Sequence, residues 1–397
     1  MPSRDFGELL AVYERELLDK VMPWWMDSAA LDREHGGILQ SLADDGTLLG
    51  TDKFMWSQCR ALYTWSALYN EIGNRHEWLD VATNILEFLL PIGRAAQWLW
   101  PQWVHRDGSV KVGPENIYSD GFAIMGATEY ARATGDDRAV DMARRTYQSV
   151  QNRLAVPGSY QASPLTPPEG AKTHGISMIF ANVFHEFGLF TANAEVLRAA
   201  HSHALQVMDV FRRPEHKLIL ECVAMDGTEL DSEVGRYVCP GHAIESMWFM
   251  LHIFRDRREP DRIAQAVECI RWHLDACWDS RYGGMFNSLD ADGTVRSADG
   301  GKSLWPHTEA LYALLLAYEL SGEQWCLDWY DLVHDWSFAN FPMRGYTQWH
   351  NTVQRDGSAP EQAEPQPNRV MDPFHLPRAL LLCTKVLELL AAKSPER

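Results

Sequence analysis

The sequence predicts an all-α protein, an (α/α)6 barrel with short β-hairpins at one rim, and three observations support this prediction. An Asp-Gly turn followed by Thr or Ser recurs five times, with its glycines at positions 46, 108, 227, 293 and 357. Gly accepts positive φ and Asp bonds its own backbone, so the pair marks a turn. Apolar residues at helical spacing follow the turns, as in ALYALLLAYEL. No linker rich in Pro, Ser or Gly separates the units.

The spacing of the turns predicts the number of units. The gaps between successive turn glycines are 62, 119, 66 and 64 residues, so one gap is about twice the others. Near its middle stands Glu169-Gly170, an eroded form of the turn, which makes six units. An open α-solenoid is the alternative, but a closed ring leaves no exposed terminal repeat. We therefore predict a single catalytic domain over residues 1–397.

The elements of one unit follow from two segments that can be laid over each other. Each runs through Gly-Gly, a short alternating stretch, the turn, Lys, Trp and an Ala-Leu helix, and the segments begin at Gly36 and Gly283. The alternating stretch with its turn predicts a small β-hairpin, and the Ala-Leu stretch predicts an inner helix. An outer helix follows, as in residues 138–154 and 261–277. Three pairs match between the segments: Lys53 with Lys302, Trp56 with Trp305, and Arg60 with Glu309.

Composition and charge exclude several classes of function. The net charge of −18 argues against binding to nucleic acid or to an anionic membrane, since both need basic patches. No apolar run reaches a membrane span of roughly 18 residues, and MPSRDFGELLAVYEREL predicts a charged amphipathic helix rather than a signal peptide. Seven scattered Cys without a CxxC pair predict reduced, buried thiols in a cytoplasmic protein. The 16 Trp serve core packing or the aromatic walls of a carbohydrate pocket.

Polar residues interrupt the apolar faces near the start of each predicted inner helix. His242 and Glu245 are three residues apart, as are His375 and Arg378, so each pair faces one side of its helix. A ring of six inner helices would point such residues at one axis, which predicts an active site there. The full set is Arg60; Tyr118 and Asp120; His174, Met178 and Asn182; Arg236, His242 and Glu245; His307 and Glu309; His375 and Arg378. The Pro-rich stretch 358–368 is predicted as a solvated loop, or as a lid over the cavity.

The residue types in this set favour proton transfer. Zinc requires three or four close ligands, and no HExxH or comparable cluster is present, so no metal site is predicted. No Walker loop, GxGxxG or GxSxG occurs, which argues against a nucleotide cofactor and a serine nucleophile. Histidine, with a pKa of about 6.5, exchanges protons at neutral pH, and Arg60 can stabilise an enolate oxyanion.

Two histidines on opposite faces of a bound molecule can remove a proton next to a carbonyl and return it. Return to the other face inverts the carbon, whereas return to the neighbouring carbon converts an aldose to a ketose. Paired carboxylates among Asp120, Glu245 and Glu309 offer an alternative, glycoside hydrolysis. A sugar-binding or inhibitory protein is a further alternative, although a binder does not need two convergent histidines.

Eight motifs make the chain resemble the N-acylglucosamine 2-epimerase family over nearly its whole length. They are EHGGILQSL, DKFMWSQCRALY, IYSDGFAIMGATEYARATGD, GRYVCPGHAIESMWFML, DSRYGGMFNSLDADG, KSLWPHTEALYALLLAY, GYTQWHNTVQRDGS and FHLPRAL. The resemblance implies an (α/α)6 barrel and a metal-independent reaction through an enediol or enolate after opening of the sugar ring. It implies no required cofactor, with ATP only as an allosteric activator.

The resemblance also implies roles for residues in the matching motifs. His242 in P-G-H-x-x-E and His375 in F-H-x-P-R correspond to the family's acid/base pair. The substrate-binding set is Arg60, Tyr118, Asp120, Asn182, Glu245, Trp305, Glu309 and Arg378. Within it, Glu245 is expected to orient His242, and Arg60 and Glu309 to hold the open-chain sugar. Asn182 stands in THGISMIFANVF, where the chain departs from the family pattern, so the C2 substituent is left open.

We therefore expect a cytoplasmic, homodimeric isomerase that acts on a monosaccharide or short sugar. The expected reaction interconverts N-acylglucosamine and N-acylmannosamine types at C2. The alternatives are aldose–ketose isomerisation of mannose-type sugars and 2-epimerisation of unsubstituted sugars.

Overall fold

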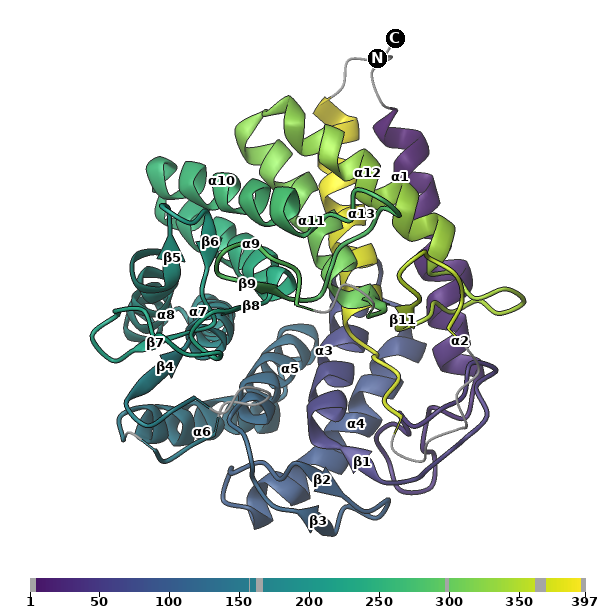
Figure 1. Cartoon of the computed structure of the whole chain (residues 1–397). Coiled ribbons are helices and arrows are strands. Elements are labelled where there is room, and N and C mark those ends of the chain that lie inside the picture. The colour runs from purple at the N-terminus through teal and green to yellow at the C-terminus, as the bar shows by residue number, and fades with distance from the viewer. Residues whose placement is uncertain (1–4, 157, 162–166, 297–299, 361–368, 394–397) are drawn as a thin grey trace.

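Six pairs of helices form a closed ring (Figure 1). The computed structural model describes residues 5–156, 158–161, 167–296, 300–360 and 369–393, and the pairs are those of this part of the chain. Each inner helix packs against the next, and the last packs against the first. The predicted (α/α)6 barrel is therefore confirmed, and the open solenoid is excluded. Of the predicted Pro-rich loop, residues 361–368 lie outside the described residues.

Inner and outer helices differ in how their apolar residues are arranged. The inner helices are α3 (Met55–Glu71), α5 (Tyr118–Thr134), α7 (His174–Phe190), α9 (Pro240–Arg257), α11 (Leu304–Ser321) and α13 (His375–Lys393). The outer helices that follow the first five are α4 (His76–Ala95), α6 (Asp137–Leu154), α8 (Ala194–Gln206) with the π-helical η2 (Val207–Phe211), α10 (Pro260–Cys277) and α12 (Gln324–Asn340). Inner helix α11 is buried along most of its length, because it packs on every side. Outer helix α6 buries one stripe and exposes a charged face.

The sixth outer helix comes from the other end of the chain. It consists of α1 (Phe6–Arg15), the π-helical η1 (Glu16–Val21) and α2 (Met22–Asp27), and α1 packs against α13. The indole of Trp349 donates a hydrogen bond to Glu16 at 2.6 Å, which ties this segment to the loop before α13. The N-terminal helix predicted from sequence thus completes the ring.

The five Asp-Gly turns are built alike. In each, the glycine N–H donates to the carbonyl three residues earlier at 2.8–3.0 Å, and the Asp carboxylate accepts the N–H of the following Thr or Ser. The five glycines have φ between 82° and 89°, and Gly170 of the eroded copy has φ 76°. The sequence repeat is therefore a repeat of structure.

Short strands at the rim join four of the six pairs of neighbouring units among the described residues. They are β1 (Lys53–Phe54), β2 (Trp103–Val104), β3 (Val110–Val112), β4 (Ala171–Thr173), β5 (Arg212–Arg213), β6 (Leu218–Ile219), β7 (Cys222–Ala224), β8 (Tyr237–Val238), β9 (Leu289–Asp290), β10 (Lys302–Ser303) and β11 (Thr352–Val353). Strands that directly precede inner helices pair with strands beyond the next outer helix: β1 with β2, β4 with β7, β8 with β9, and β10 with β11. The β2–β3 hairpin encloses the Gly108 turn, as predicted.

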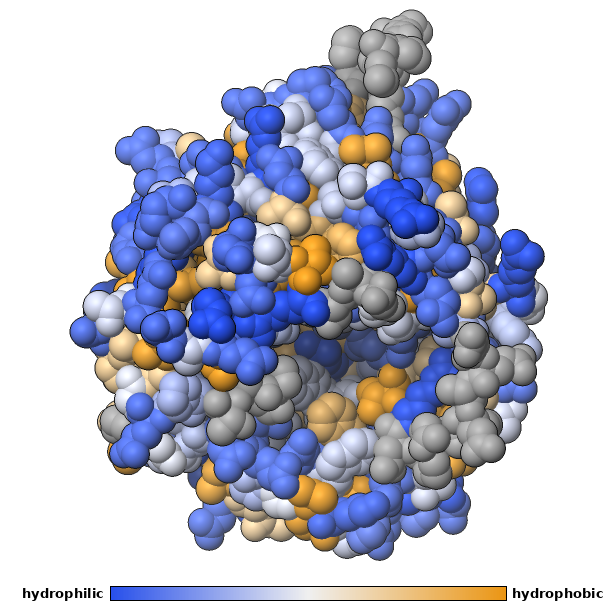
Figure 2. Space-filling view, in the orientation of Figure 1, coloured by the Kyte–Doolittle hydropathy of each residue, from blue (hydrophilic) through white to orange (hydrophobic). Residues whose placement is uncertain are grey.

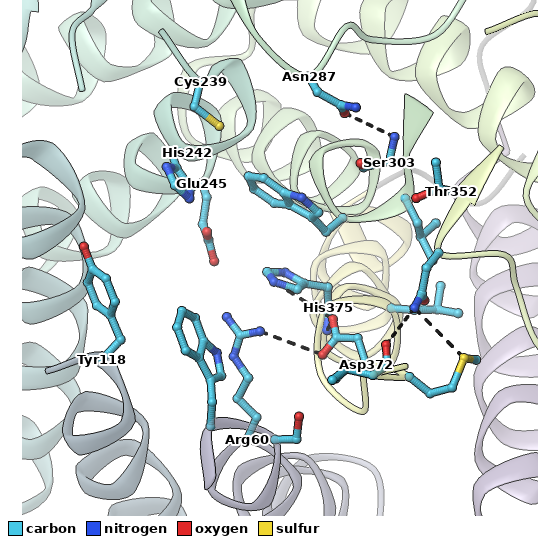
Figure 3. A pocket seen from close by; sticks show the side chains of 18 of the residues that line it. Arg60, Tyr118, Cys239, His242, Glu245, Asn287, Ser303, Thr352, Asp372 and His375 are labelled. Carbon is cyan, nitrogen blue, oxygen red and sulfur yellow. Dashed lines mark hydrogen bonds and ion pairs between the residues drawn. The ribbon is translucent and has the colours of Figure 1, made fainter. Parts of the chain in front are cut away.

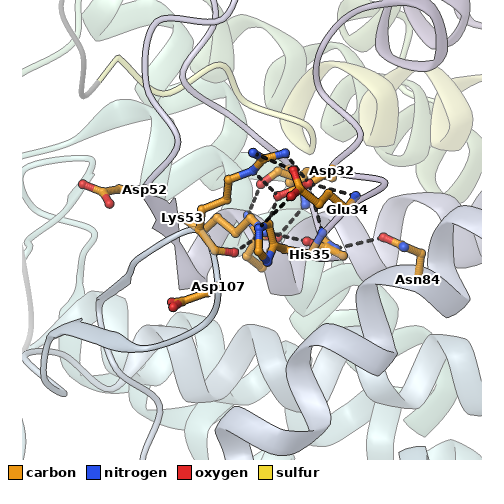
Figure 4. A network of polar contacts seen from close by, with 12 residues as sticks. Asp32, Glu34, His35, Asp52, Lys53, Asn84 and Asp107 are labelled. Carbon is orange, nitrogen blue, oxygen red and sulfur yellow. Dashed lines mark hydrogen bonds and ion pairs between the residues drawn. The ribbon is translucent and has the colours of Figure 1, made fainter.

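Lys53 and Lys302, which match between two units, are each buried in a polar network, and the two networks are built alike. Lys53 Nζ lies 2.9 Å from Asp32 and donates to the Gly36 carbonyl at 2.5 Å, and Arg106 pairs with the same carboxylate at 2.9 Å (Figure 4). A buried ammonium requires such partners. The counterparts in the second network are Lys302, Asp279, Gly283 and Arg355. The network holds the start of an inner helix against the preceding loop, which accounts for the repeated lysine.

The core contains all seven cysteines, each free and buried, as predicted. Trp25, Trp65 and Trp100 are fully buried within it. Among the described helices, none combines the length and the apolar character needed to cross a bilayer.

Candidate active site

A cavity of about 610 Å³ opens at the end of the ring where the inner helices begin (Figures 2 and 3). First-turn residues of all six inner helices line it: Trp56 of α3, Tyr118 of α5, Gly175 of α7, His242 of α9, Trp305 of α11 and His375 of α13. Its volume lies within the range of about 300–1,000 Å³ that is usual for ligand pockets. The tryptophans thus serve both roles considered from the sequence, core packing and pocket walls.

His375 is held by a buried chain of charges. Its Nδ1 lies 2.6 Å from Glu309, and the Arg378 guanidinium donates at 2.7 Å to both Glu309 and Glu245. The second oxygen of Glu309 accepts a hydrogen bond from Trp248 at 2.8 Å. Because Nδ1 of His375 is engaged by Glu309, Nε2 is the nitrogen that can face a ligand.

Glu309 and Arg378 stabilise each other's charge. Burial alone would raise the pKa of Glu309, but Arg378 and His375 hold this pKa below its ordinary value. Burial alone would lower the pKa of Arg378, but Glu309 and Glu245 raise this pKa above its ordinary value. Neither Glu309 nor Arg378 lines the cavity, so their placement does not fit the prediction that they bind sugar directly. Glu309 instead positions His375, and Arg378 joins Glu309 to Glu245.

His242 is oriented by a carboxylate other than the predicted one. Its Nδ1 lies 3.2 Å from Glu221, and the same oxygen lies 3.3 Å from Nδ1 of His174. Glu245, which was expected to orient His242, lines the cavity and accepts from Arg378 instead. Glu221 precedes β7, outside the inner helices that the repeat marks, so the sequence argument missed it. A carboxylate between two histidines of different helices becomes recognisable only once the units are folded together.

The contact between Glu221 and His242 favours the charged form of both groups. Burial alone would raise the pKa of Glu221, but the charge of His242 and hydrogen bonds from His174 and His242 hold this pKa well below its usual range. Burial alone would lower the pKa of His242, but its contacts with Cys239 and Glu221 raise this pKa well above its ordinary value. This shift favours the imidazolium form of His242, the form that can donate a proton.

Trp305 links the two histidines. Its ring centroid lies 5.3 Å from that of His242 and 5.5 Å from that of His375. Both imidazoles therefore border the same part of the cavity, and a molecule stacked on this indole would lie within reach of both. This is the convergence of His242 and His375 that the repeat predicted.

Arg60 provides a cation at the cavity (Figure 3). Its guanidinium lies against the rings of three aromatic residues, Trp56, Phe122 and Phe374. Burial lowers the pKa of Arg60 to about 10, against the raising effect of Asp372 and Glu245, so the group remains charged at neutral pH. Asp372, 3.8 Å from Arg60, also accepts the backbone N–H of His375 at 3.0 Å. Asp372 thus connects the cation to the start of α13 and was not predicted from sequence.

The remaining predicted residues divide between the cavity and its surroundings. Tyr118 and Met178 line the cavity, whereas Asn182, farther along α7, is buried outside the lining. Asp120 also lies outside it: its fully buried carboxylate pairs with Arg153 at 2.5 Å. Residues two positions apart on a helix point in different directions, which explains why Asp120 does not face the cavity as Tyr118 does. Burial raises the pKa of Asp120 to about 6, against the lowering effect of Arg153.

His307 is a structural residue of α11. Its Nε2 accepts the N–H of Met285 at 2.8 Å, and its Nδ1 donates to the Ser303 carbonyl at 2.8 Å. Gln58 in the first unit accepts the N–H of Ile38 at the same distance. Both side chains hold an inner helix against the preceding loop, so His307 does not belong to the ring of cavity groups.

A polar wall of the cavity comes from rim strands and loops outside the inner helices. It is formed by Asn287, Ser303, Gln348, Asn351, Thr352 and Asp372. Amide and hydroxyl groups placed in this way suit the hydroxyls of a sugar. None of them lies on an inner helix, where the candidate residues were sought, which is why they were not predicted from the sequence.

Comparison with known proteins places this site in a family. The family model of N-acylglucosamine 2-epimerase (GlcNAc 2-epimerase) matches residues 36–376. The chain belongs to the N-acylglucosamine 2-epimerase family. It is 29% identical to N-acylglucosamine 2-epimerase of Bos taurus, over 95% of this chain and 90% of that protein.

Solved structures share the fold of this N-acylglucosamine 2-epimerase family member. A sugar epimerase from a ruminal bacterium matches with a TM-score of 0.81 at 19% identity, covering 95% of this chain and 98% of that one. A D-mannose isomerase matches with a TM-score of 0.79 at 16% identity, covering 98% and 100%. Family membership identifies the protein as an isomerase of a sugar 2-epimerase family, and membership of this family implies a small sugar as substrate.

Proposed function

We propose that the protein interconverts N-acylglucosamine and N-acylmannosamine types of sugar at C2, with His242 and His375 as the acid/base pair. The observation that carries the proposal is that both histidines line one cavity and each is engaged at Nδ1 by a buried carboxylate. This leaves Nε2 of each ring for the substrate. The bovine relative, named an N-acylglucosamine 2-epimerase, supports the choice of substrate class.

The two histidines take different roles in one direction of the reaction. In the open-chain aldose, Nε2 of His375 removes the proton from C2, and the electrons pass to the carbonyl oxygen to give an enolate. His242, which is protonated, delivers its proton to the opposite face of C2. The roles exchange in the reverse direction. Each proton moves between substrate carbon and imidazole, so the proposed reaction requires no cofactor.

Arg60 and the cavity walls stabilise the oxyanion and bind the substituents of the sugar. The Arg60 guanidinium is held among aromatic rings, where a cation stabilises a developing oxyanion more strongly than in water. The start of α7 contributes an apolar surface of Gly175, Met178 and Ile179. We assign the acyl methyl group to this surface and the sugar hydroxyls to the polar wall across the cavity.

Proton exchange in D2O tests the proposal. The protein is incubated with N-acetylmannosamine in D2O and followed by NMR. N-acetylglucosamine carrying deuterium at C2 is the expected product. Absence of both this product and deuterated substrate would refute the N-acyl proposal. Parallel incubations with mannose, glucose and cellobiose identify the alternatives, because a ketose formed from mannose would show an aldose–ketose isomerase.

Glu221→Gln is expected to shift the alkaline limb of the pH–rate profile to lower pH. The carboxylate raises the pKa of His242, so its loss lowers this pKa and the acid form disappears at a lower pH. Above the new pKa, each unit of decrease costs about tenfold in the protonated fraction. The measurement is kcat/KM against pH. Glu229→Gln, at an exposed carboxylate, is the control, and an unchanged alkaline limb in Glu221→Gln would contradict the assignment.

A further inference from the structure

Cys239 stands beside His242 and Glu221 at the edge of the cavity. One ligand atom from each of the three lies within 4.8 Å of the others. Cys239 immediately precedes α9 and His242 lies in its first turn, while Glu221 reaches them from the segment before β7. Cys239 and His242 both line the cavity, and Glu221 lies behind them. The reaction proposed above uses His242 and Glu221 but has no role for the thiol.

A thiol, an imidazole and a carboxylate are the donor types that zinc prefers. In a tetrahedral zinc site the ligand atoms lie roughly 3.3–3.8 Å apart, given bonds of about 2.0–2.3 Å. The Glu221–His242 contact of 3.2 Å is already close to that separation. The Cys239 sulfur lies within 4.8 Å of both of the other ligand atoms, so a modest side-chain movement is enough to bring it to a zinc-ligand separation. Three protein ligands leave a fourth coordination position, and two of these ligands, Cys239 and His242, line the cavity.

We propose that Cys239, His242 and Glu221 form a binding site for a thiophilic divalent cation such as Zn²⁺, and that the bound cation blocks the sugar site. The thiol proton and the acidic proton of His242 pass to solvent when the cation binds. The cation replaces the proton on Nδ1 of His242, the atom that faces Glu221, and the ring becomes neutral. Its remaining N–H is a much weaker acid than an imidazolium and protonates carbon far less readily. Because Cys239 and His242 both line the cavity, a cation held by them also obstructs the entry of the sugar. The binding site stands on its own geometry, whereas its inhibitory effect rests on the proposed function.

Two other clusters of the described residues offer weaker sites. The Glu245–Glu309–His375 group already surrounds the Arg378 guanidinium, which occupies the place of a cation. The exposed group Glu215, His216 and Glu229 contains no sulfur. A metal that prefers sulfur ligands should therefore bind at the Cys239 site and not at either of the other two clusters.

Cobalt(II) is the probe for binding, since a thiolate ligand produces a charge-transfer absorption band. The protein is first treated with metal and then freed of it with a chelator. It is then titrated with Co²⁺, and the charge-transfer band is expected to saturate at one equivalent of Co²⁺. Cys239→Ser should abolish the band. Loss of a direct ligand should weaken binding by more than the about 10–100-fold that an outer-shell partner contributes. Glu221→Gln should also weaken binding, and His216→Ala, which disrupts the exposed cluster, should not.

Two results would overturn the proposed site. One is a wild-type protein without the band; the other is a Cys239→Ser protein, shown to be folded by circular dichroism, that keeps it. Inhibition is measured separately, as the rate of C2 deuteration with and without Zn²⁺. The rate of the wild-type protein should fall when Zn²⁺ is added. The rate of Cys239→Ser should stay near its own metal-free value. Binding without inhibition of an active enzyme would refute the blocking effect. If the protein turns over no sugar before metal is added but gives the band when Co²⁺ is added, the proposed function is refuted and the metal site is supported.

Discussion

Replacing His375 with asparagine is expected to lower kcat for C2 epimerisation by about 10²–10⁴-fold, the contribution of a positioned acid or base. The Asn amide can still donate to Glu309, which lies 2.6 Å from Nδ1 in the native protein. No atom of Asn replaces Nε2, so the buried charges keep a partner while the proton acceptor is lost. NMR in D2O measures turnover, and thermal unfolding followed by circular dichroism verifies the fold.

His307→Gln is the matched control, because it also removes a buried histidine from the start of an inner helix. A glutamine can accept the N–H of Met285, just as Gln58 accepts that of Ile38 in the first unit. This variant should retain kcat near the native value. If His375→Asn loses no more activity than His307→Gln, His375 is not part of the acid/base pair.

The repeat made the fold and the two histidines predictable from the sequence. Identical turns with positive-φ glycines place the start of each inner helix, and inner-helix starts are where His242 and His375 reach the cavity. The sixth outer helix carries no such turn, so the sequence did not show that the N-terminal segment would close the ring. Closure depends on apolar packing between α1 and α13, which a turn motif does not encode.

The positioning carboxylates were harder to predict than the histidines. Glu245 was assigned to His242 because the two share a helix face, but the longer-range partner Glu221 holds that imidazole at 3.2 Å. Glu245 is instead drawn to Arg378 on another helix. Spacing along one helix predicts which residues share a face, but it does not predict which charge on a neighbouring element competes for them. Asp120 shows the same limit, because its partner Arg153 lies on an outer helix.

Arg378→Met is expected to lower the free energy of unfolding by about 3–5 kcal/mol, the usual cost of removing one partner from a buried ion pair. Methionine fills much of the space but leaves Glu245 and Glu309 without their guanidinium, and both side chains are at most 4% exposed. Chemical denaturation at neutral pH measures the loss. Additional Glu245→Gln and Glu309→Gln changes should restore much of it, because no buried charge then remains unpaired.

The dependence of stability on pH separates this electrostatic cause from simple loss of packing. In the native protein the pKa of Glu309 is lowered, so its contribution is present above the unfolded pKa and is lost as pH falls through the folded pKa. In Arg378→Met, Glu309 loses the charge that most lowers its pKa, and burial is expected to raise this pKa, so the folded state binds more protons than the unfolded state. Its free energy of unfolding should therefore rise from neutral toward mildly acidic pH, where the native protein shows no such gain. A variant that loses stability equally at every pH would instead identify the effect as packing, and Arg378 would no longer be the group that keeps two carboxylates ionised beside His375.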